Sequence, residues 1–524
     1  MIKSSVDPEC TGQFSQLFLD YIKEKPQLSP FFNVFPHIKN FEPLIKGRNF
    51  NEHAREVLSK ALERQYDGLQ ISELTLNQIN SLRQANTFTV TTGHQLNLFT
   101  GPMYFIYKIV STINLAEKLK SAYPDYHFVP VYWMATEDHD FDEINYFKLD
   151  GKKYQWNTAQ SGPVGDFQLD QSFKNFFQEI AHFLPDFFKE AYQNSEKLSQ
   201  AVRKYVHYLF EHKGLLIVDG NDSSLKALFS QVIREDLFSH IPHEMVKSQT
   251  EELEKLGYKS QIFPREINLF YMEKGLRERI EKDKHGSFNV LNTDLVFSKK
   301  EIEELIERSS EKFSPNVVLR PLYQEMILPN LAYLGGPAEV VYWLQLKPVF
   351  DHFGIQFPTL LPRNFAMILD AAIQRKISKL GLKDIELFQS VEDWKKQFLL
   401  EHASFDLALT EEKVTLSKIF DEAGEKAVSL DQTLDGAFKA AKVRASKILE
   451  QLTGKVRKAE ERRQAVHIRQ RQEIQDYINP GGSPQERVEN FMRFYLGNQQ
   501  FIDELFELFD PLDFSYLILK ENYG

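Results

Sequence analysis

Two short polar segments contain the side chains of this chain that are best suited to chemistry. They read Gly93-His94-Gln95 and Thr136-Glu137-Asp138-His139-Asp140. Asp138, His139 and His94 are candidate catalytic residues, because carboxyl and imidazole groups can move protons near neutral pH. Gly93, Gln95, Glu137 and Asp140 are candidate contacts to a substrate or a nucleotide. Burying so many charged groups together is costly unless they are paired, bound to a metal or used.

The elements around these segments predict one β-α-β unit. Residues 87–91 and the apolar run 129–135 suit buried strands, and each strand is followed by one of the polar segments. A turn at Thr100-Gly101-Pro102 comes before a helix that carries Tyr104 and Lys108, with Pro102 as its first residue. In an open parallel sheet, ligands bind beyond the carboxyl ends of the strands. A helix start at that edge also attracts anions such as phosphate.

Structural roles explain the same residues without a ligand. Glu137 and Asp138 could cap the following helix, where acids are favoured. His94 could be a polar residue of a turn. The occurrence of both segments after neighbouring strands favours function over these alternatives.

The stretch 317–364 supplies further binding candidates. Arg320 is expected at the end of a strand, 317–319, where its guanidinium can hold a carboxylate or phosphate, and Gln324 lies on the helix that follows. A strand at 331–334 ends in the turn Gly335-Gly336-Pro337, which brings free backbone N–H groups to a helix start near Glu339. A last strand, 358–362, ends at Arg363. The alternatives are salt bridges for the two arginines and a tight turn without a ligand for the glycines.

A third strand, 215–218, ends in Asp219-Gly220-Asn221-Asp222. These residues could contact a ligand at the same edge of the sheet. They could equally form an Asp-Gly turn and a helix cap.

Composition narrows the class of protein. The 524 residues include 42% hydrophobic side chains, which indicates a globular chain of several domains. A net charge of −11 argues against general binding of nucleic acid. The single cysteine, Cys10, excludes an internal disulfide and favours a reducing compartment. We find neither a signal peptide nor an apolar run long enough to span a membrane, and we therefore expect a cytoplasmic protein.

The segments TGHQLNLFTGPMYFIYK, VPVYWMATEDHDFDEIN, VVLRPLYQEMILPNLAYLGGPAEVVYWLQLKPVFDHFG and PTLLPR resemble the BshC family of bacillithiol biosynthesis. The likeness covers most of the chain, including QERVENFMRFY near its end. GHQ departs from the GQQ that we expect in this family. The resemblance implies a Rossmann-like parallel-sheet core of the nucleotidyltransferase and class I synthetase kind, an inserted subdomain and a coiled-coil homodimer.

Sequence and resemblance together give an α/β fold with a C-terminal helical coiled-coil hairpin. Leu434, Phe438, Ala441, Ala445, Ile448 and Leu452 follow the spacing of a coiled-coil seam. The basic run 455–471 is mixed with acids and favours a solvated helix face. The expected parts are 1–150, N-terminal helices and the first half of the core; 151–310, core continuation with an inserted α/β subdomain; 311–390, second half of the core; 391–479, the hairpin; and 480–524, helices docked on the core.

The family implies a ligase that joins the carboxyl group of cysteine to the amine of glucosaminyl-malate, with ATP and Mg²⁺ as the expected co-substrate and ion. His94, Gln95, Lys108 and the helix start after Gly101 would stabilise phosphoryl charge. Asp138 or His139 would act as the base, and Arg320 and Arg363 would bind the malate group. The alternatives are a metal-dependent hydrolase that uses the acidic segment and a non-catalytic coiled-coil scaffold.

Overall fold

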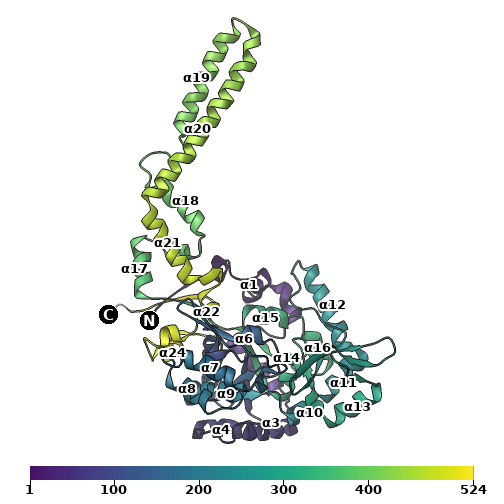
Figure 1. Ribbon diagram of the computed structural model, residues 1–524. Helices are drawn as coiled ribbons and strands as arrows, with labels where there is room; N and C mark the ends of the chain where they lie inside the picture. The colour runs from purple at the N-terminus through teal and green to yellow at the C-terminus, as the bar shows by residue number, and fades with distance from the viewer. Residues whose placement is uncertain (523–524) are drawn as a thin grey trace. The chain divides into compact units, whose positions relative to one another are not determined.

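The computed structural model describes residues 1–522 and divides into two units. We call residues 3–367 and 483–519 the core unit, and residues 368–482, together with the chain from 520 on, the helical unit. Figure 1 shows the chain coloured from its N-terminus to its C-terminus. No helix within residues 1–522 combines the length and the apolar character that crossing a membrane requires.

The core unit is built on a five-stranded sheet of order β13-β12-β2-β3-β6, in which all neighbours are parallel. Nearly every residue of these strands is buried, as is typical of parallel sheets covered on both faces. Their bounds are β2 Thr87–His94, β3 His127–Met134, β6 Leu216–Asp219, β12 Asn330–Gly335 and β13 Thr359–Pro362. β2 is longer than the predicted strand, because Gly93 and His94 still pair with Trp133 and Met134 of β3.

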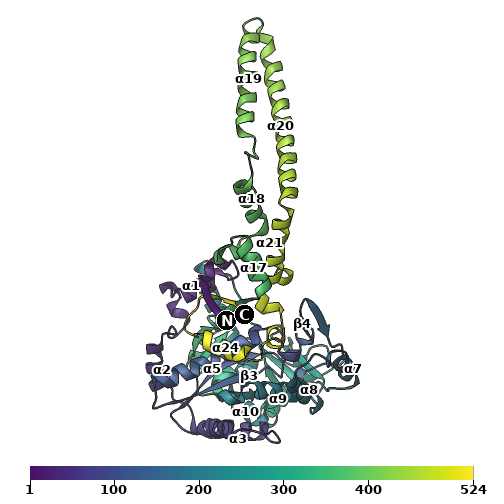
Figure 2. The same cartoon turned by 90° about the vertical axis from the view of Figure 1, so that its left-hand side faces the viewer.

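The strand order reverses beside β2. From β2 the chain proceeds to β3 and β6 on one side, and later returns to β12 and β13 on the other. Helix α5, Tyr104–Ala122, packs against β2 and β3 (Figure 2 labels α5 and β3). Its Leu115 and Leu119 share a core with Phe88 and Val90. This arrangement confirms the predicted Rossmann-like fold, whose binding crevice lies where the order reverses.

A second, antiparallel sheet of order β10-β9-β8-β7-β11, which we call the small sheet, lies between β6 and β12 in the chain. Its strands are β7 Leu269–Glu273, β8 Leu276–Lys282, β9 Phe288–Val290, β10 Val296–Phe297 and β11 Phe313–Pro315. A hairpin of β4 Tyr146–Leu149 and β5 Lys152–Gln155 comes before it in the chain. The chain before β7 is a loop, in which the Gln345 side chain accepts the backbone N–H groups of Gln261 and Ile262.

Helices surround both sheets of the core unit. Their bounds are α1 Gln16–Ile22, α2 Phe41–Gly47, α3 Glu52–Gln65, α4 Glu73–Ser81, α6 Phe141–Ile144, α7 Gln171–Ile180, α8 Asp186–Gln193, α9 Leu198–Phe210, α10 Ser223–Ala227, α11 Ser230–Ser239, α12 Ile241–Lys255, α13 Lys299–Arg308, α14 Arg320–Ile327, α15 Pro337–Trp343, α16 Lys347–His352, α22 Gln485–Val488, α23 Met492–Tyr495 and α24 Phe501–Leu508.

The chain ends are not purely helical, which corrects the expectation for both. β1 Ile2–Val6, β15 Tyr516–Lys520 and β14 Phe365–Leu369 form a three-stranded sheet of order β1-β15-β14. The apolar run of β15 has five residues, a length at which periodicity does not separate a strand from a buried helix.

The helical unit contains α17 Ala371–Lys379, α18 Val391–His402, α19 Thr410–Val428, α20 Asp435–Arg463 and α21 Ala465–Ile478. α19 and α20 run side by side as the predicted hairpin (Figures 1 and 2). Lys442 on α20 bonds the carboxylate of Asp421 on α19 at 2.7 Å. The interpretation of 455–471 as one solvated face is wrong at its end. The side chain of Arg471 is fully buried, and it donates to the backbone oxygen of Gln389 at 2.6 Å.

Candidate active site

The core unit has a cavity of about 880 Å³ at the carboxyl ends of β2, β3 and β12. Gly93, His94 and Gln95 line it from the end of β2. Glu137, Asp138, His139 and Asp140 line it from the loop after β3, which we call the acidic loop (Thr136–Asp140). Tyr104, Lys108, Arg320 and Glu339 line it from helices α5, α14 and α15. The structure thus gathers most of the predicted site residues around one cavity at the reversal of strand order.

The remaining predicted site residues lie outside this cavity. They are Thr100, Gly101, Gln324, Gly335, Gly336 and Arg363. Gln324 is fully buried behind Arg320, and its Oε1 accepts from Arg320 Nη1 at 3.1 Å. Gly335 and Gly336 end β12 and precede α15, where the N–H of Gly336 donates to Glu339 Oε2 at 2.7 Å.

Arg363 is not available to bind a dianionic substrate. It is 2% exposed, its Nη2 bonds Glu486 Oε1 at 2.5 Å, and its Nη1 donates to the Asn364 carbonyl at 2.9 Å. The guanidinium also lies over the ring of Tyr104, 5.2 Å from its centroid. Arg363 therefore packs against Tyr104 of the cavity wall and forms a salt bridge, which is one of the two roles that the sequence allowed.

The start of α5 is closed by the chain itself. The helix begins at Tyr104 and not at Pro102, and the N–H of Met103 donates to the Glu489 carbonyl at 2.8 Å. The preceding loop, which includes Thr100 and Gly101, is tied by Asn490, whose Nδ2 donates to the Gly101 carbonyl at 2.7 Å. The N–H groups of Met103, Phe105 and Ile106 already have backbone acceptors, so the expected anion site at this helix start has few free donors.

The acidic loop has a fixed conformation. Asp138 Oδ1 accepts the backbone N–H groups of His139 at 2.7 Å and Asp140 at 3.3 Å, and its Oδ2 accepts from Gln95 Nε2 at 2.8 Å. Gln95 Nε2 also donates to Glu143 Oε2 at 2.9 Å. Because each carboxylate oxygen can accept more than one hydrogen bond, Asp138 keeps lone pairs for a substrate proton.

His139 is held by an arginine that sequence reasoning missed. Arg277, on β8 of the small sheet, approaches His139 Nδ1 at 2.6 Å and also donates to Ser314 Oγ and the Pro315 carbonyl. A guanidinium only donates, so Nδ1 of His139 is the acceptor and its Nε2 carries the proton. His139 is therefore a hydrogen-bond donor in this geometry, and Asp138 is the better candidate base.

Glu137 is paired beneath the cavity. Its Oε2 accepts from Lys226 Nζ at 2.8 Å, and the same ammonium donates to the Phe313 carbonyl of β11 at 2.7 Å. Lys226 is fully buried and was not among the predicted residues. Lys226 thus joins Glu137 of the acidic loop to Phe313 of the small sheet, the same sheet that carries Arg277. These residues are far apart in the sequence.

A second charged cluster surrounds Gly93. Lys108 Nζ donates to the Gly93 carbonyl at 2.8 Å and forms an ion pair with Glu339 Oε2. Glu339 Oε1 accepts from Tyr333 Oη at 2.7 Å. Burial would raise the pKa of Glu339, but Lys108, Tyr333 and the N–H of Gly336 outweigh it and lower that pKa to about 2. Glu339 is therefore charged at neutral pH, while burial lowers the pKa of Lys108 and the nearby Glu339 carboxylate opposes that lowering.

Arg320 completes this cluster. It opens α14 and does not end a strand, because the Asn316 side chain accepts the N–H of Val318 at 2.8 Å and turns the chain into a helix. Its guanidinium lies 5.7 Å from the ring centroid of Tyr333. A Cβ at Gly93 would lie 3.3 Å from Tyr333 Oη and 3.5 Å from Arg320 Nη1, so glycine allows both groups to approach β2. Within residues 1–522, Arg320 has no ion pair to a carboxylate, which leaves its charge available to an anion.

His94 lies 8% exposed against the rings of Tyr104 and Phe105. Its Nδ1 is 2.9 Å from the Gln95 carbonyl and must donate there, so Nε2 is a bare acceptor that is buried without a partner. Burial, together with the nearby charge of Lys108, lowers the pKa of His94 to about 3. The predicted role of His94 as a donor to phosphoryl oxygens is therefore wrong for this tautomer.

The lowered pKa of His94 predicts sensitivity to acid. The unfolded chain binds this proton below pH ~6.5 and the folded chain only below about 3, so stability falls with pH between those values by at most ~1.4 kcal/mol per pH unit. His94→Gln removes this proton and should flatten the decline of the thermal midpoint over that range. His53→Gln, at an exposed histidine on α3, is the control and should leave the decline unchanged. Parallel curves for His94→Gln and the unmodified protein would contradict the assignment.

The acidic loop does not form a ready metal centre. Within residues 1–522, no three His, Cys, Asp or Glu side chains are arranged to hold a metal ion together. Glu137 is engaged by Lys226, Asp138 by Gln95 and His139 by Arg277. The hydrolase alternative therefore lacks the ligand set that it requires.

Comparison with known proteins covers nearly the whole chain. The family model "Bacillithiol biosynthesis BshC, N-terminal Rossmann-like domain" matches residues 1–364, and "Bacillithiol biosynthesis BshC, C-terminal coiled-coil domain" matches residues 366–521. A Flavobacterium psychrophilum protein named "Putative cysteine ligase BshC" is 41% identical over 528 residues, 97% of this chain and 98% of that protein. Relatives of the same name are 41% identical in Flavobacterium johnsoniae, over 98% of both chains, and 28% identical in Chlorobaculum tepidum, over 92% of both chains.

Proposed function

This chain belongs to the BshC family of bacillithiol biosynthesis, and on that premise we propose that it is a cysteine ligase. The reaction joins the carboxyl group of cysteine to the amine of glucosaminyl-malate through an amide bond and gives bacillithiol. The observation that carries the proposal is the near full-length match to relatives bearing the ligase name. The cavity at the reversal of strand order supports the proposal, because ligands of open α/β sheets bind at such a position.

The cluster around Gly93 holds anionic oxygens during activation of the cysteine carboxyl group. ATP supplies the leaving group for that activation, with Mg²⁺ as its counter-ion. The buried Lys108 and the half-buried Arg320 lie beside one carboxylate, Glu339, so the cluster keeps a net positive charge. In a site with little water, such fixed donors stabilise developing negative charge strongly.

The donor set of the cavity fits a magnesium nucleotide. Mg²⁺ is usually held by one or two protein carboxylates together with phosphate oxygens. Asp140 lines the cavity, and its carboxylate has no hydrogen bond or ion pair within residues 1–522, so it is the one we assign to Mg²⁺. The unpartnered Nε2 of His94 can accept a hydrogen bond from a bound hydroxyl or amine.

Asp138 takes a proton from the attacking amine, and His139 donates through Nε2. The amine attacks only in its neutral form, which requires an acceptor within hydrogen-bond reach. Arg277 fixes the His139 ring, and Gln95 fixes the Asp138 carboxylate. Two further arginines, Arg265 and Arg279, line the cavity without an ion pair among residues 1–522 and replace Arg363 as the contacts to the malate carboxylates.

A reconstituted reaction tests the proposed function. The purified protein is incubated with cysteine, glucosaminyl-malate, ATP and Mg²⁺, and bacillithiol, AMP and ADP are quantified by mass spectrometry. We expect bacillithiol to form only when all components are present. AMP release would assign an adenylate route, and ADP release an acyl phosphate route. Folded protein that gives no bacillithiol would overturn the ligase proposal for these substrates.

The helical unit is proposed to form a homodimer through its hairpin. α19 and α20 leave an apolar groove of about 580 Å³ that is lined by Leu416, Ile419, Ile448 and Leu452. Ile419 and Ile448 are 57% and 59% exposed and lie in this one groove, and a contiguous exposed apolar surface is typical of an interaction site.

The single cysteine and the use of cysteine as substrate are consistent with a cytoplasmic location of the protein.

A charge in this groove should break the dimer. Ile448→Glu would place a carboxylate in the apolar contact, and light scattering on the eluting protein should show half the mass of the unmodified protein. Val443→Glu is a matched control, because Val443 is 56% exposed on the same helix and does not line the groove. An unchanged mass for Ile448→Glu would exclude the groove as the dimer contact.

A further inference from the structure

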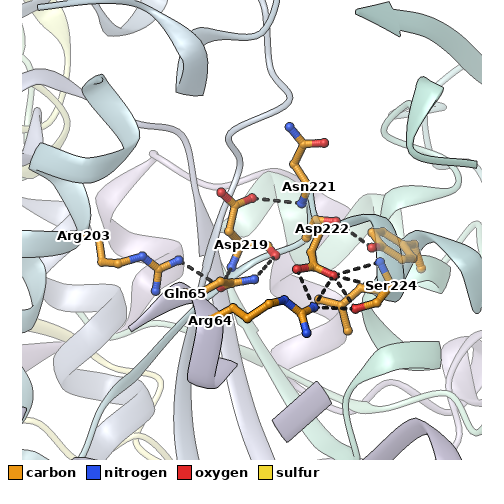
Figure 3. Close-up of polar contacts among 10 residues, drawn as sticks. Arg64, Gln65, Arg203, Asp219, Asn221, Asp222 and Ser224 are labelled. Atoms are coloured by element: carbon orange, nitrogen blue, oxygen red, sulfur yellow. Dashed lines mark hydrogen bonds and ion pairs between the residues drawn. The ribbon is translucent and has the colours of Figure 1, made fainter. Parts of the chain in front are cut away.

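Two aspartates at the end of β6 have different surroundings (Figure 3). Asp222 caps α10, where its Oδ1 accepts the N–H groups of Ser224 at 2.9 Å and Leu225 at 3.2 Å. It also pairs with the exposed Arg64 at 3.0 Å. Asp222 therefore has a complete structural role at the protein surface, which is the helix-cap alternative from the sequence.

Asp219 lies at the edge of the sheet, beside the acidic loop. Its Oδ1 accepts from the Thr136 hydroxyl at 2.5 Å and from the N–H of Asn221 at 2.9 Å. Thr136 is the first residue of the acidic loop and is 2% exposed. The carboxylate therefore joins the end of β6 directly to the segment that carries Asp138 and His139.

The end of β6 is itself rigidly held. Gln65 on α3 accepts the N–H of Asp219 and donates to its carbonyl, both at 2.9 Å (Figure 3). Arg203 on α9 donates to Gln65 Oε1 at 3.0 Å and to the Ile217 carbonyl at 2.7 Å. The helices α3 and α9 thus fix the backbone from which the Asp219 carboxylate extends. A carboxylate held in this way can also hold the hydroxyl group that it binds.

The acidic loop is held at its first residue by this bond, in addition to the bonds that Lys226, Gln95 and Arg277 make to the residues that follow. It is followed by α6, which has only four residues, and the Asp140 side chain makes no cap at its start. The backbone N–H groups of Val164 and Gly165 also hold the loop, through bonds to the Asp138 carbonyl at 2.7 Å and to the Thr136 carbonyl at 2.9 Å. Asp219 does not line the cavity, so it can act only through Thr136.

We propose that Asp219 is a positioning residue for the ligase reaction: its hydrogen bond to Thr136 sets the acidic loop so that Asp138 and His139 meet the substrate amine. The inference rests on the proposed function, because the group that it positions is the proposed base. Misplacing a reacting group by ~1 Å costs about 100-fold in rate, even when the substituted residue is remote from the chemistry.

Four variants test the inference in the full chain. Thr136→Val removes the hydrogen bond and should lower kcat about 100-fold, with a much smaller change in KM. Asp219→Asn keeps an acceptor oxygen but replaces a charged acceptor with a weaker neutral one, and it should lower kcat in the same direction by a smaller factor. Thr136→Ser keeps the hydroxyl and should restore most of the rate. The control, Asp222→Asn, keeps an oxygen that caps α10 and loses only the charge that pairs with the exposed Arg64, so it should change the thermal midpoint little and leave kcat unchanged.

A double variant separates positioning from general damage. Asp219→Asn with Thr136→Val should be no slower than the slower single variant, because both act on one interaction. Full kcat in folded Asp219→Asn and Thr136→Val would overturn the inference and leave the ligase proposal standing. Multiplying losses in the double variant would also overturn it.

Hydrogen exchange supplies a readout that does not depend on activity. The amides of residues 137–140 should exchange faster in Asp219→Asn than in the unmodified protein or in Asp222→Asn. If the unmodified protein makes no bacillithiol, the ligase proposal fails while this difference still supports the tie between β6 and the loop. Equal exchange in all three proteins would overturn the tie itself.

Discussion

Replacing Asp138 with asparagine should lower kcat of the ligase reaction by roughly 10²- to 10⁴-fold, the usual contribution of a positioned acid or base. The backbone N–H groups of His139 and Asp140 require an oxygen at the Oδ1 position. The asparagine amide therefore faces Gln95 Nε2, which is itself a donor. The variant loses the proton acceptor and also places two donors against each other.

Steady-state kinetics with a mass-spectrometric readout of bacillithiol checks this expectation. Asp142→Asn is a matched control, because Asp142 is an exposed acid on α6 that does not line the cavity, and it should retain kcat. His139→Ala should lose less than Asp138→Asn, since His139 donates a hydrogen bond and does not accept the proton. Folded Asp138→Asn with full activity would remove Asp138 from the mechanism.

The sequence predicted the parts of the site that follow long, strongly patterned elements. The strand before Gly93 and the strand before Thr136 are apolar runs bounded by polar turns, and both runs form strands in the structure. Their parallel pairing placed both polar segments at one edge of the sheet, as the switch-point rule requires. Local pattern and global topology agree here, so the prediction is confirmed at the level of the fold.

Other parts depend on contacts between distant residues, which no local pattern contains. Arg277 comes from a short strand, LRERIEK, whose charges favour a solvated surface, yet the small sheet turns this arginine into the cavity. From local sequence Arg363 is a candidate contact to the substrate. Its actual partner, Glu486, lies 123 residues later in the chain, so no local pattern indicates their ion pair. Arg320 was expected at a strand end, but one side chain, Asn316, starts a helix there. Each difference comes from a side chain whose partner is set by tertiary structure.

The second large effect concerns stability at the Lys108–Glu339 pair. Lys108→Met should destabilise the core unit by about 3–5 kcal/mol, because it leaves a mostly buried carboxylate without its cation. Glu339 would keep its bonds from Tyr333 and the N–H of Gly336 and could not turn to solvent without breaking them. Thermal and urea unfolding, followed by tryptophan fluorescence, measure the loss. Lys120→Met, at an exposed lysine on the same helix, should cost less than about 0.5 kcal/mol.

The deficit of Lys108→Met should depend on pH in a defined direction. Glu339 has a folded pKa of about 2 against a usual value of 4.5, so its contribution is present above pH 4.5 and is lost as the pH falls toward 2. Lys108 is a main cause of that lowering, and the variant should therefore be closest to the unmodified protein in acid. Glu339→Gln added to Lys108→Met removes both charges and should recover part of the loss, with a coupling of roughly 0.5–3 kcal/mol. A deficit that is the same at pH 7 and pH 3, and that Glu339→Gln does not reduce, would show that Lys108 contributes through packing alone.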